Sequence, residues 1–451
     1  MGKLFGTDGV RGVANRDLTF ELASKIGQAG AYVLGRENKK SPKILIGMDT
    51  RRSGSMLEAA LAAGIMSMGG DVVCAGVVPT PAVAYLTRTL GFDAGIVVSA
   101  SHNSAEFNGI KFFNSDGYKL RDEIEEDIED IILNDEPVAE RPIGGNVGTL
   151  MRNESLLSRY IDYAVNTVDV DFSGLKIALD CANGASSKTA PAAFKALGAE
   201  VLVIHNTPDG ININRDCGST HMESLMQFVK DNGCDMGFAY DGDADRVLAV
   251  DKNGKSVDGD VIMAICGSEM KKNGSLKGNT IVATIMSNLG LFKMGDDNNI
   301  SIAKTKVGDR YVLQEMIDRG YCLGGEQSGH VIFLDYNTTG DGLVTSLQLT
   351  KIIKNSEKTL DELAKIITIY PQVLENARVE RSGDSDYIED EDIMNEISRL
   401  NVKYNGRGRV LIRPSGTEPL IRVMIEGEDI REIGRDAKAL ADLIGKKLRK
   451  A

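Results

Sequence analysis

The sequence predicts an α/β fold: three topologically similar α/β domains with mixed sheets, followed by a smaller C-terminal α+β domain. The first observation behind this prediction is an internal repeat, because residues 93–101 and 235–243 share one pattern. Both read Asp-x-Gly, then three apolar or aromatic residues, then a polar–small–polar triplet. Two further strand-like runs precede each copy in the same order, Lys43–Asp49 and Gly70–Val73 before the first and Lys176–Asp180 and Ala199–Leu202 before the second. This order indicates a duplicated α/β unit.

A third, fainter copy is the second observation. It runs through residues 280–283, 300–303 and 320–326. Aligning the three copies places Ser101, Asp243 and Glu326 after the corresponding strand of each unit.

The chain after residue 371 departs from this pattern. Residues 409–423 are typical of strand, tight loop and strand, and residues 430–450 of a basic amphipathic helix. These elements predict a separate C-terminal domain. The four predicted domains span residues 1–155, 156–256, 257–368 and 369–451.

Composition and charge limit the class of protein. With 451 residues, 42% of them hydrophobic and 26% charged, the chain is long enough for about three domains. A net charge of −13 argues against a nucleic-acid surface, which needs a basic patch. No apolar run reaches the ~20 residues that span a bilayer, and residues 1–6 lack the apolar core of a signal peptide. We therefore expect a soluble, cytoplasmic protein without nucleic-acid or membrane partners.

The cysteines predict neither a disulfide framework nor a zinc site. They form no C-x-x-C pair, and five lie in or beside apolar runs: Cys74, Cys181, Cys234, Cys266 and Cys322. We expect these five to be reduced thiols in the core of a cytosolic protein. Cys217 lies in a polar stretch and is the exception.

The N-terminal region opens with a glycine-punctuated loop. Residues 6–12 place Arg11 among glycines, which lets backbone approach an anion closely, although many N-terminal turns look similar. Helical periodicity over residues 18–35 and a strand over 43–48 come next. The segment 49–52, Asp-Thr-Arg-Arg, then opens a second helix, and it predicts either an anion site or a helix cap with solvated arginines.

The apolar run Ile96–Val98 ends in the polar residues 99–103, Ser-Ala-Ser-His-Asn. A hydroxyl at the end of a buried strand is held rigidly, so Ser101 is a candidate nucleophile or phosphate carrier. The alternative is a turn rich in Ser and Asn. Lys111 is the only base in the next apolar strand, 107–113, and is either a site cation or a snorkelling edge residue.

Between the first two units, three further segments are predicted. Residues 121–135 favour a charged helix with a solvated face, and residues 137–148 favour an irregular stretch. A long helix is expected over 150–167, with the domain boundary in or near it.

Three carboxylates follow the apolar run of the second unit directly: Asp241, Asp243 and Asp245. At this spacing they cannot share one helical face, but they can converge in an extended or looped backbone. Convergent carboxylates completed by a phosphate oxygen suit Mg²⁺. An acidic turn is the alternative, weakened because Arg246 compensates charge. An EF-hand is excluded because Lys252 stands where that loop needs its final Glu.

The third unit and the last domain each contain a polar loop. Glu326, Ser328 and His330 lie in the run Gly-Gly-Glu-Gln-Ser-Gly-His, whose groups match a polyol-binding site; a structural role explains His330 equally well. The last domain offers backbone and hydroxyl donors flanked by arginines, which predicts a nest for a phosphate monoester. The residues of this nest are Arg413, Ser415, Gly416, Thr417 and Arg422. A hairpin with incidental arginines is the alternative.

Together these motifs resemble those of the α-D-phosphohexomutase superfamily, in family order and over essentially the whole chain. The motifs that carry the resemblance are residues 6–12, 99–103, 241–246, 325–330 and 413–419. The resemblance implies four domains around a central cleft. The Gln at position 327 resembles the residue of the glucosamine-specific branch, whereas the phosphomannomutase/phosphoglucomutase branch usually has Met at this position. Ser104 departs from the pattern, because the family usually has Pro at that position.

The resemblance further implies an isomerase phosphorylated on Ser101. Its phosphate would pass to glucosamine 6-phosphate, and a bound glucosamine 1,6-bisphosphate would return a phosphate to Ser101. Glucosamine 1-phosphate would leave for UDP-N-acetylglucosamine and cell-wall synthesis. One Mg²⁺ per chain would be held by the phosphoserine and the three aspartates.

The remaining implied roles concern charge and substrate contacts. Lys111 and His330 would be general acid and base in an order left open, and Arg11 and Arg246 would stabilise charge. Glu326 and Ser328 would hold sugar hydroxyls, and the nest of residues 413–422 would hold the other phosphate. The alternatives are a mutase for mannose or glucose phosphate, a phosphatase, and a non-catalytic sugar-phosphate sensor. The family also suggests a homodimer.

Overall fold

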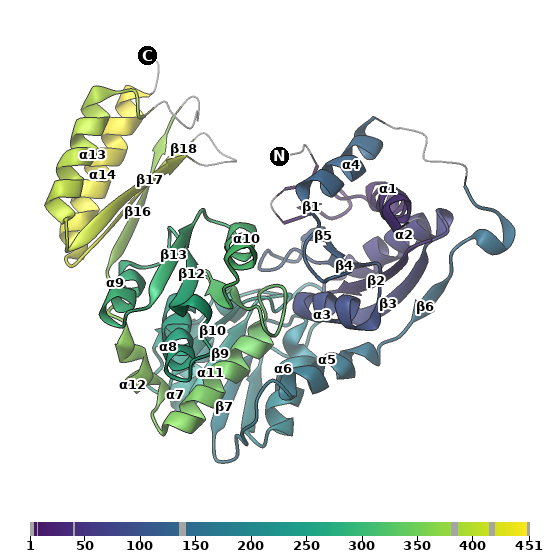
Figure 1. Ribbon diagram of the computed structural model, residues 1–451, viewed down its shortest axis with the longest axis horizontal. Helices are drawn as coiled ribbons and strands as arrows, with labels where there is room; N and C mark the ends of the chain where they lie inside the picture. The colour runs from purple at the N-terminus through teal and green to yellow at the C-terminus, as the bar shows by residue number, and fades with distance from the viewer. Residues whose placement is uncertain are drawn as a thin grey trace. The chain divides into compact units, whose positions relative to one another are not determined.

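The computed structural model describes residues 4–6, 8–38, 41–134, 141–379, 387–414 and 420–448. Its internal contacts divide the chain into two compact units (Figure 1). The first unit comprises Met1–Met286 and Asn299–Ile366, and the second comprises Ser287–Asn298 and Ile367–Ala451. Within the described residues, no helix has both the length and the apolar character needed to cross a membrane.

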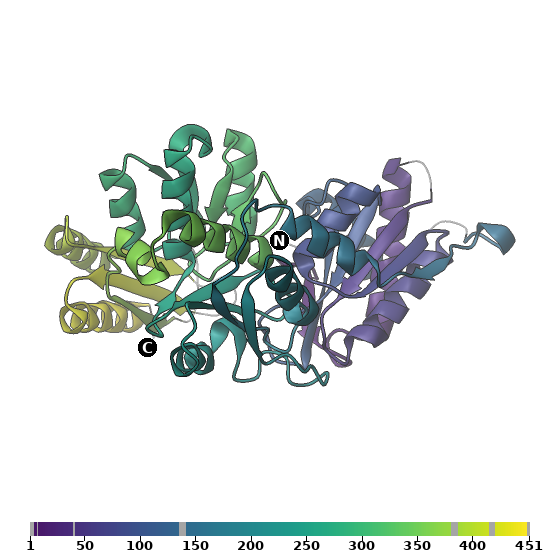
Figure 2. The same cartoon turned by 90° about the horizontal axis from the view of Figure 1, so that it is seen from below.

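The first sheet has the strand order β1-β5-β4-β2-β3-β6. Its strands are β1 (Val10–Val13), β2 (Lys43–Met48), β3 (Asp71–Val77), β4 (Ala94–Val98), β5 (Phe107–Asn114) and β6 (Leu150–Arg152). The associated helices are α1 (Phe20–Asn38), α2 (Gly54–Ser67), α3 (Thr80–Leu90) and α4 (Asp122–Leu133). Figure 2 shows helices on both faces of this purple-to-blue sheet.

The alternation of side chains along β2 and β4 explains this layering. Ile46 and Ile96 belong to the core shared with α1, α2 and α4. Gly47 and Gly95 are the strand neighbours of these isoleucines. They therefore belong to the opposite face of the sheet, because successive residues of a strand face opposite sides. A Cβ at either glycine would meet Val83 of α3 within 3.0 Å. These glycines therefore let α3 lie close to the sheet.

The second and third sheets repeat the central part of the first. The second has the order β11-β10-β9-β7-β8 and the third β13-β12-β14-β15. In all three, an antiparallel pair (β4/β5, β9/β10, β14/β15) adjoins two parallel strands. The sheet topology thus confirms the predicted repeat, including its third copy.

The elements of the second and third sheets follow in chain order. The strands are β7 (Lys176–Asp180), β8 (Glu200–Ile204), β9 (Met236–Tyr240), β10 (Val247–Asp251), β11 (Ser256–Val257), β12 (Thr280–Thr284), β13 (Ser301–Thr305), β14 (Leu323–Gly325) and β15 (Val331–Phe333). The α-helices are α5 (Leu156–Val165), α6 (Ser186–Ala196), α7 (Glu223–Asp231), α8 (Gly259–Lys272), α10 (Asp309–Arg319), α11 (Gly342–Ser356) and α12 (Leu360–Leu363). The short 3₁₀ turns of the described residues are η1 (Gly144–Asn146), η2 (Gly218–Thr220), η3 (Lys277–Asn279) and η4 (Ala364–Ile366).

The second unit is an antiparallel sheet in the order β16-β18-β17, with α13 and α14 on one side of it (Figure 1). Its elements are α9 (Leu289–Asp297), β16 (Gln372–Arg378), α13 (Glu391–Tyr404), β17 (Gly408–Pro414), β18 (Leu420–Gly427) and α14 (Ile430–Lys447). Ile421, Val423 and Ile425 alternate along β18 and pack into the core with the two helices. The predicted separate C-terminal domain is confirmed, whereas the predicted boundaries at residues 155, 256 and 368 stay a prediction.

Two local predictions in the linking region are wrong. The long helix predicted over residues 150–167 is instead β6, which pairs in parallel with Val72–Cys74 of β3, followed by α5. The free edge of β3 supplies hydrogen-bond partners that a sequence pattern does not show, and this context overrides local propensity. The face of α4 is not wholly solvated either, because Glu129 is buried and accepts the amides of Leu4 and Phe5 at 2.8 and 2.9 Å.

A buried hydrogen bond between α5 and the start of α11 gives a test of this packing. The Tyr160 hydroxyl donates to Asp341 at 2.7 Å, and Asp341 also caps α11 through the Val344 amide. We expect Tyr160→Phe to lower the free energy of unfolding by about 1–2 kcal/mol, because a buried carboxylate loses a partner. Urea denaturation measures this loss. Tyr32→Phe is the control, because the Tyr32 hydroxyl makes no hydrogen bond within the described residues; an equal loss in both variants contradicts the assignment.

Candidate active site

Ser101 lies just beyond the end of β4, where the sequence placed it. Its backbone has a left-handed φ of 51°, and its side chain is buried. The hydroxyl donates to Asp241 Oδ2 at 2.6 Å, and the amide donates to Ser99 Oγ at 2.9 Å. A left-handed backbone at a residue other than Gly is uncommon and persists only where the surroundings hold it.

The loop that carries Ser101 is held by buried groups that the sequence analysis missed. Arg51 donates to the carbonyl oxygens of Ser101 and Asn103 at 3.1 and 2.5 Å. Asn214, from the second α/β domain, donates to the same two oxygens at 2.9 Å each. Arg51 also pairs with the buried Asp49. The buried Arg51 is therefore not a solvated arginine, whereas Arg52 is exposed, as that alternative predicted for the segment; the anion site stays a prediction.

The three aspartates converge beside Ser101, as predicted. Asp241, Asp243 and Asp245 are buried and each places a carboxylate oxygen within 4.8 Å of the others. Burial, together with the charges of Asp245 and Asp243, raises the pKa of Asp241 well above its usual value. Oδ1 of Asp243 and Oδ1 of Asp245 are buried without a hydrogen bond among the described residues. Unpaired carboxylate oxygens at one point fit a hard divalent cation.

The close approach of the Ser101 loop and the loop of the three aspartates depends on Gly242. A Cβ at this position would lie 2.5 Å from the Ser101 carbonyl oxygen. Thr80, the first residue of α3, fixes the other side of the loop. Its hydroxyl donates to Asp243 Oδ2 at 2.6 Å and its amide donates to the Asp243 carbonyl at 2.9 Å.

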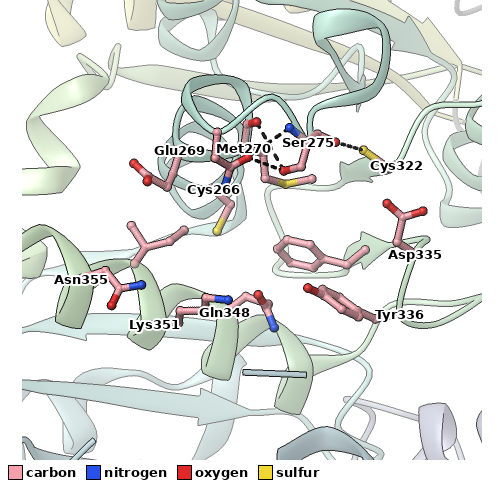
Figure 3. Close-up of a pocket in the computed structure, with 13 residues that line it drawn as sticks. Cys266, Glu269, Met270, Ser275, Cys322, Asp335, Tyr336, Gln348, Lys351 and Asn355 are labelled. Atoms are coloured by element: carbon pink, nitrogen blue, oxygen red, sulfur yellow. Dashed lines mark hydrogen bonds between the residues drawn. The ribbon is translucent and has the colours of Figure 1, made fainter. Parts of the chain in front are cut away.

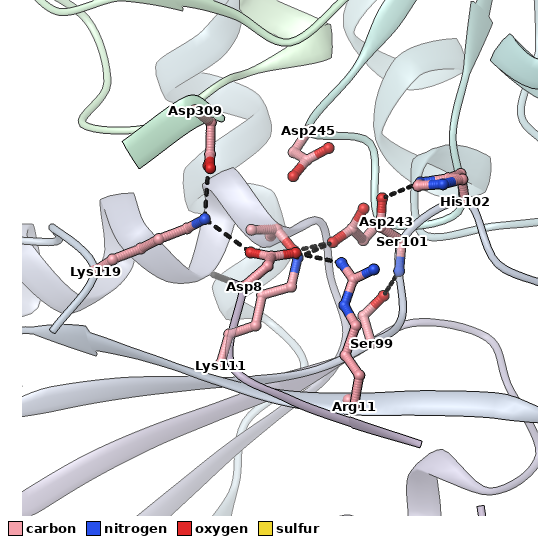
Figure 4. A network of polar contacts seen from close by, with 12 residues as sticks. Asp8, Arg11, Ser99, Ser101, His102, Lys111, Lys119, Asp243, Asp245 and Asp309 are labelled. Carbon is pink, nitrogen blue, oxygen red and sulfur yellow. Dashed lines mark hydrogen bonds and ion pairs between the residues drawn. The ribbon is translucent and has the colours of Figure 1, made fainter. Parts of the chain in front are cut away.

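A network of cations and carboxylates surrounds the site (Figure 4). Lys111, on β5, is buried and lies 3.2 Å from Asp243 and 3.0 Å from Asp8. Burial lowers the pKa of Lys111, but these two carboxylates outweigh it and raise the pKa above its usual value. Lys119 joins Asp8 at 2.7 Å to Asp309 at 2.6 Å, which connects the first and third α/β domains. Of the two predictions for Lys111, the structure supports the site cation.

Arg11 lies at the edge of this network on β1 and pairs with Asp8. Arg246 follows the aspartates, with its backbone amide donating to Asp241 at 3.2 Å. Its guanidinium lies 3.9 Å from Asp245 and 3.4 Å from the His102 ring. Asp8 lies in the predicted loop of residues 6–12, whereas Lys119 had no signal in the sequence beyond its charge.

His330 is buried between two carboxylates. Its Nδ1 lies 3.6 Å from Asp245, and its Nε2 lies 3.6 Å from Asp309. The Gly340 amide donates to Nε2 at 3.1 Å. This donor assigns the proton of the neutral ring to Nδ1, which faces Asp245.

The side chains in the loop of residues 325–330 differ in their partners and in their exposure. Glu326 accepts the Gly308 amide at 3.0 Å, and Ser328 is exposed. Gln327 donates to Asp258 at 3.0 Å, and Asp258 caps α8. The side chain on which the predicted sugar preference rests therefore supports a helix cap.

The predicted phosphate nest belongs to the second unit. Arg413 on β17 and Arg422 on β18 are direct cross-strand partners. Like charges opposite each other disfavour a sheet, so this pair fits a site that an anion completes. Ser415, Gly416 and Thr417 lie outside the described residues.

Two cavities of the first unit differ in charge. One adjoins His330 and is lined by three basic residues, Lys119, Arg121 and Arg310, and by three acidic ones, Asp122, Glu123 and Asp309. The other lies between α8 and α11 (Figure 3), and Lys351 is the only cation among its lining residues. Lys351 is 2.7 Å from Asp169. The first cavity therefore suits a phosphorylated ligand better than the second.

Comparisons with known proteins agree with this site. The chain matches four models in order, described as phosphoglucomutase/phosphomannomutase alpha/beta/alpha domains I, II and III and the C-terminal domain. They cover residues 2–139, 158–254, 258–370 and 374–443. A family protein from Burkholderia thailandensis shares the fold, with a TM-score of 0.78, 24% identity and 97% of each chain covered.

The chain therefore belongs to the phosphoglucomutase/phosphomannomutase family, as its motifs predicted. Its relatives include the phosphoglucosamine mutase of Clostridium novyi (strain NT), 60% identical over 447 residues and 99% of both chains. The phosphoglucosamine mutase of Acetivibrio thermocellus is 59% identical over 448 residues, which cover 99% of this chain and 100% of the relative.

The Asp8–Lys119–Asp309 bridge gives a test with a defined pH dependence. Burial raises the pKa of both carboxyls, but Lys119 and neighbouring cations outweigh it, so both values lie below the usual 3.8. A depressed pKa stabilises the folded state above the unfolded-state pKa, and this stabilisation is lost as pH falls through the folded-state values. We expect Lys119→Met to lower the free energy of unfolding by about 1–3 kcal/mol at pH 7 and by less near pH 3.

The control for this variant is Lys272→Met, which breaks a largely exposed pair with Glu269. Exposed pairs contribute little, so we expect a loss below about 0.5 kcal/mol. Urea denaturation at both pH values measures the two variants. A Lys119→Met loss that equals the control, or that is the same at both pH values, contradicts the bridge.

Proposed function

We propose that the protein is a sugar-phosphate mutase that carries a phosphoryl group on Ser101 and interconverts glucosamine 6-phosphate and glucosamine 1-phosphate. The single observation that carries the mechanism is the 2.6 Å hydrogen bond from the Ser101 hydroxyl to Asp241, inside the three-aspartate cluster. The substrate is proposed from the relatives of about 60% identity that bear the name phosphoglucosamine mutase.

Mg²⁺ is the cofactor that this donor set favours, with Asp241, Asp243 and Asp245 as its protein ligands. A phosphoryl oxygen on Ser101 would complete the set. When bound, Mg²⁺ would offset the charge of the carboxylates and the phosphoserine and polarise the phosphorus. The unpaired oxygens of Asp243 and Asp245 support this role.

In the forward direction, the C1 hydroxyl of glucosamine 6-phosphate attacks the phosphorus of phospho-Ser101. The new bond joins the C1 oxygen to phosphorus, and the bond from phosphorus to the Ser101 oxygen breaks. The bisphosphate formed turns over in the site. The Ser101 oxygen then attacks the 6-phosphate, which restores phospho-Ser101 and leaves glucosamine 1-phosphate.

Proton transfer and charge stabilisation fall to the groups around Ser101. Lys111 carries a proton at neutral pH, with its pKa raised by Asp243 and Asp8, and is the candidate acid that protonates the leaving Ser101 oxygen. His330 is then the candidate base, once a substrate hydroxyl replaces the Gly340 amide at Nε2. Arg11 and Arg246 are proposed to stabilise the transferred phosphoryl group.

Substrate binding is proposed for two further sets of residues. Glu326 and Ser328 would hold sugar hydroxyls. Arg413 and Arg422, with Ser415, Gly416 and Thr417, would hold the phosphate that is not transferred. A cytoplasmic location and a homodimer stay predictions from the sequence, as does the supply of product to UDP-N-acetylglucosamine synthesis.

A mutase for mannose or glucose phosphate is the second candidate function. It is favoured by one observation: Gln327 binds Asp258, so its side chain does not read the sugar in this arrangement. The non-catalytic sensor is disfavoured because the chain keeps both the Ser101 hydroxyl and the aspartate cluster beside it, which a sensor does not need.

Replacing Ser101 tests the phosphoserine mechanism. We expect Ser101→Ala to lower mutase turnover by at least ~10³-fold, because the covalent carrier is gone. Sugar-phosphate binding, measured by calorimetry, should persist. Ser104→Ala, an exposed serine in the same loop, should keep near-normal turnover. Near-normal activity of Ser101→Ala would rule out this mechanism.

Comparing substrates tests the sugar assignment. A coupled mutase assay with Mg²⁺ is run on glucosamine 6-phosphate, mannose 6-phosphate and glucose 1-phosphate. We expect kcat/KM for glucosamine 6-phosphate to exceed the others by ~100-fold, about 2.7 kcal/mol of discrimination. Comparable rates on the neutral sugars would keep the mechanism and favour the second candidate function.

A further inference from the structure

A second cluster of metal-ligating side chains lies in the domain built on β7–β11. Asp180 ends β7, His205 follows β8 directly, and Cys217 precedes η2. One donor atom from each lies within 4.8 Å of the other two. None of the three residues takes part in the phosphoryl-transfer site described above. Cys217 is also the cysteine that the sequence pattern left unplaced.

Asp180 and His205 lie slightly closer together than two ligands of one ion. Asp180 Oδ2 lies 2.9 Å from His205 Nδ1. Within the described chain this buried Nδ1 makes no aligned hydrogen bond. At zinc–ligand bond lengths of about 2.0–2.3 Å, tetrahedral ligand atoms lie roughly 3.3–3.6 Å apart. A small outward shift of the donor atoms would therefore admit an ion between them.

The donor atoms are held in place by backbone groups. Asp180 is fully buried and accepts the amides of Ala182 and Gly218, each at 2.9 Å. Each carboxylate oxygen keeps a further lone pair for a metal. Cys217 is fully buried, with the Asn183 side-chain amide 3.9 Å from its sulfur. The His205 side chain is 29% exposed, which leaves solvent a route to the cluster.

We propose that Asp180, His205 and Cys217 bind a transition-metal ion of the Zn²⁺ class, with a fourth position open to a ligand from solvent. Thiolate, imidazole and carboxylate together select such ions, because Mg²⁺ and Ca²⁺ prefer oxygen ligands. Binding releases the thiol proton of Cys217 to solvent. One thiolate and one carboxylate then balance the two charges of the ion, so the buried site is neutral. The donors come from the ends of separate elements, which is why no C-x-x-C spacing marks the site.

The site braces the loop that supports Ser101. His205 and Cys217 stand at the two ends of residues 205–217, and Asn214 in this segment donates to the carbonyls of Ser101 and Asn103. His205, Asn214 and Asp216 have left-handed φ values of 48°, 57° and 53°. Such conformations are held only by their surroundings. An ion that joins both ends of the segment restricts it and thereby positions Asn214 against the Ser101 loop.

Cobalt(II) tests the site on the full-length protein, because a cobalt–thiolate bond gives a near-ultraviolet charge-transfer band. Mg²⁺ is kept in excess, and the three-aspartate cluster contains no sulfur. We expect one equivalent of Co²⁺ to produce the band in the wild type. Cys217→Ser should lose the band, whereas Cys234→Ser, which removes another buried thiol of the same domain, should keep it. No band in the wild type, or an undiminished band in Cys217→Ser, overturns the proposal.

His205→Asn is the second variant, chosen because Asn tolerates the left-handed backbone at this position. It keeps the thiol, so we expect the band to persist but to need at least ~10-fold more Co²⁺. An unchanged Co²⁺ affinity removes His205 from the site and overturns the three-residue assignment. Zn²⁺ in the presence of Mg²⁺ should raise the melting temperature of the wild type and not that of Cys217→Ser. An equal rise in both overturns the bracing role.

Discussion

The structure depends on burying three carboxylates beside one hydroxyl. Asp241, Asp243 and Asp245 are buried beside Ser101, where burial and the charges of Asp245 and Asp243 raise the pKa of Asp241. Lys111 compensates part of this charge from β5. Two carboxylate oxygens still have no hydrogen-bond partner among the described residues. Because negative charge remains uncompensated there, the cluster suits a cation, and it suits a phosphoryl group that binds the same cation.

A repeated fold meets this requirement by bringing different side chains to equivalent places. The strands β4, β9 and β14 occupy the same position in three sheets, and each is followed by a loop that carries a predicted site residue. The first loop supplies a hydroxyl, the second carboxylates and the third polar groups suited to a sugar. Contacts between domains then set their positions: Thr80 holds Asp243, Asn214 holds the Ser101 loop, and Lys119 joins Asp8 to Asp309. The repeated fold places the three loops at equivalent strand ends, and the contacts between domains fix the positions of their side chains.

The support of the Ser101 loop extends well behind the reacting atoms. Arg51, from the first α/β domain, and Asn214, from the second, donate hydrogen bonds to the same two carbonyl oxygens. Asn214 in turn belongs to the segment that ends at His205 and Cys217. A left-handed Ser101 is therefore held by Arg51 and Asn214, and Asn214 lies in a segment whose two ends belong to a second polar cluster. Substitutions of residues distant from Ser101 can therefore alter the position of the loop that carries it.

The sequence by itself determined the repeated α/β units, the separate last domain, and the placement of Ser101, the three aspartates and Lys111. These features are local: an apolar run marks a strand, and a polar triplet after it marks a loop at the end of that strand. Only the tertiary structure decided the partners of Arg51, Lys119 and Asn214, and it turned the start of a predicted helix into β6. In sequence such charged or amide side chains look solvated, and apart from Asp49, which is two positions from Arg51, their partners lie from 48 to 190 positions away. These side chains can hold the site in place only because they are buried, and their burial depends on how the domains pack.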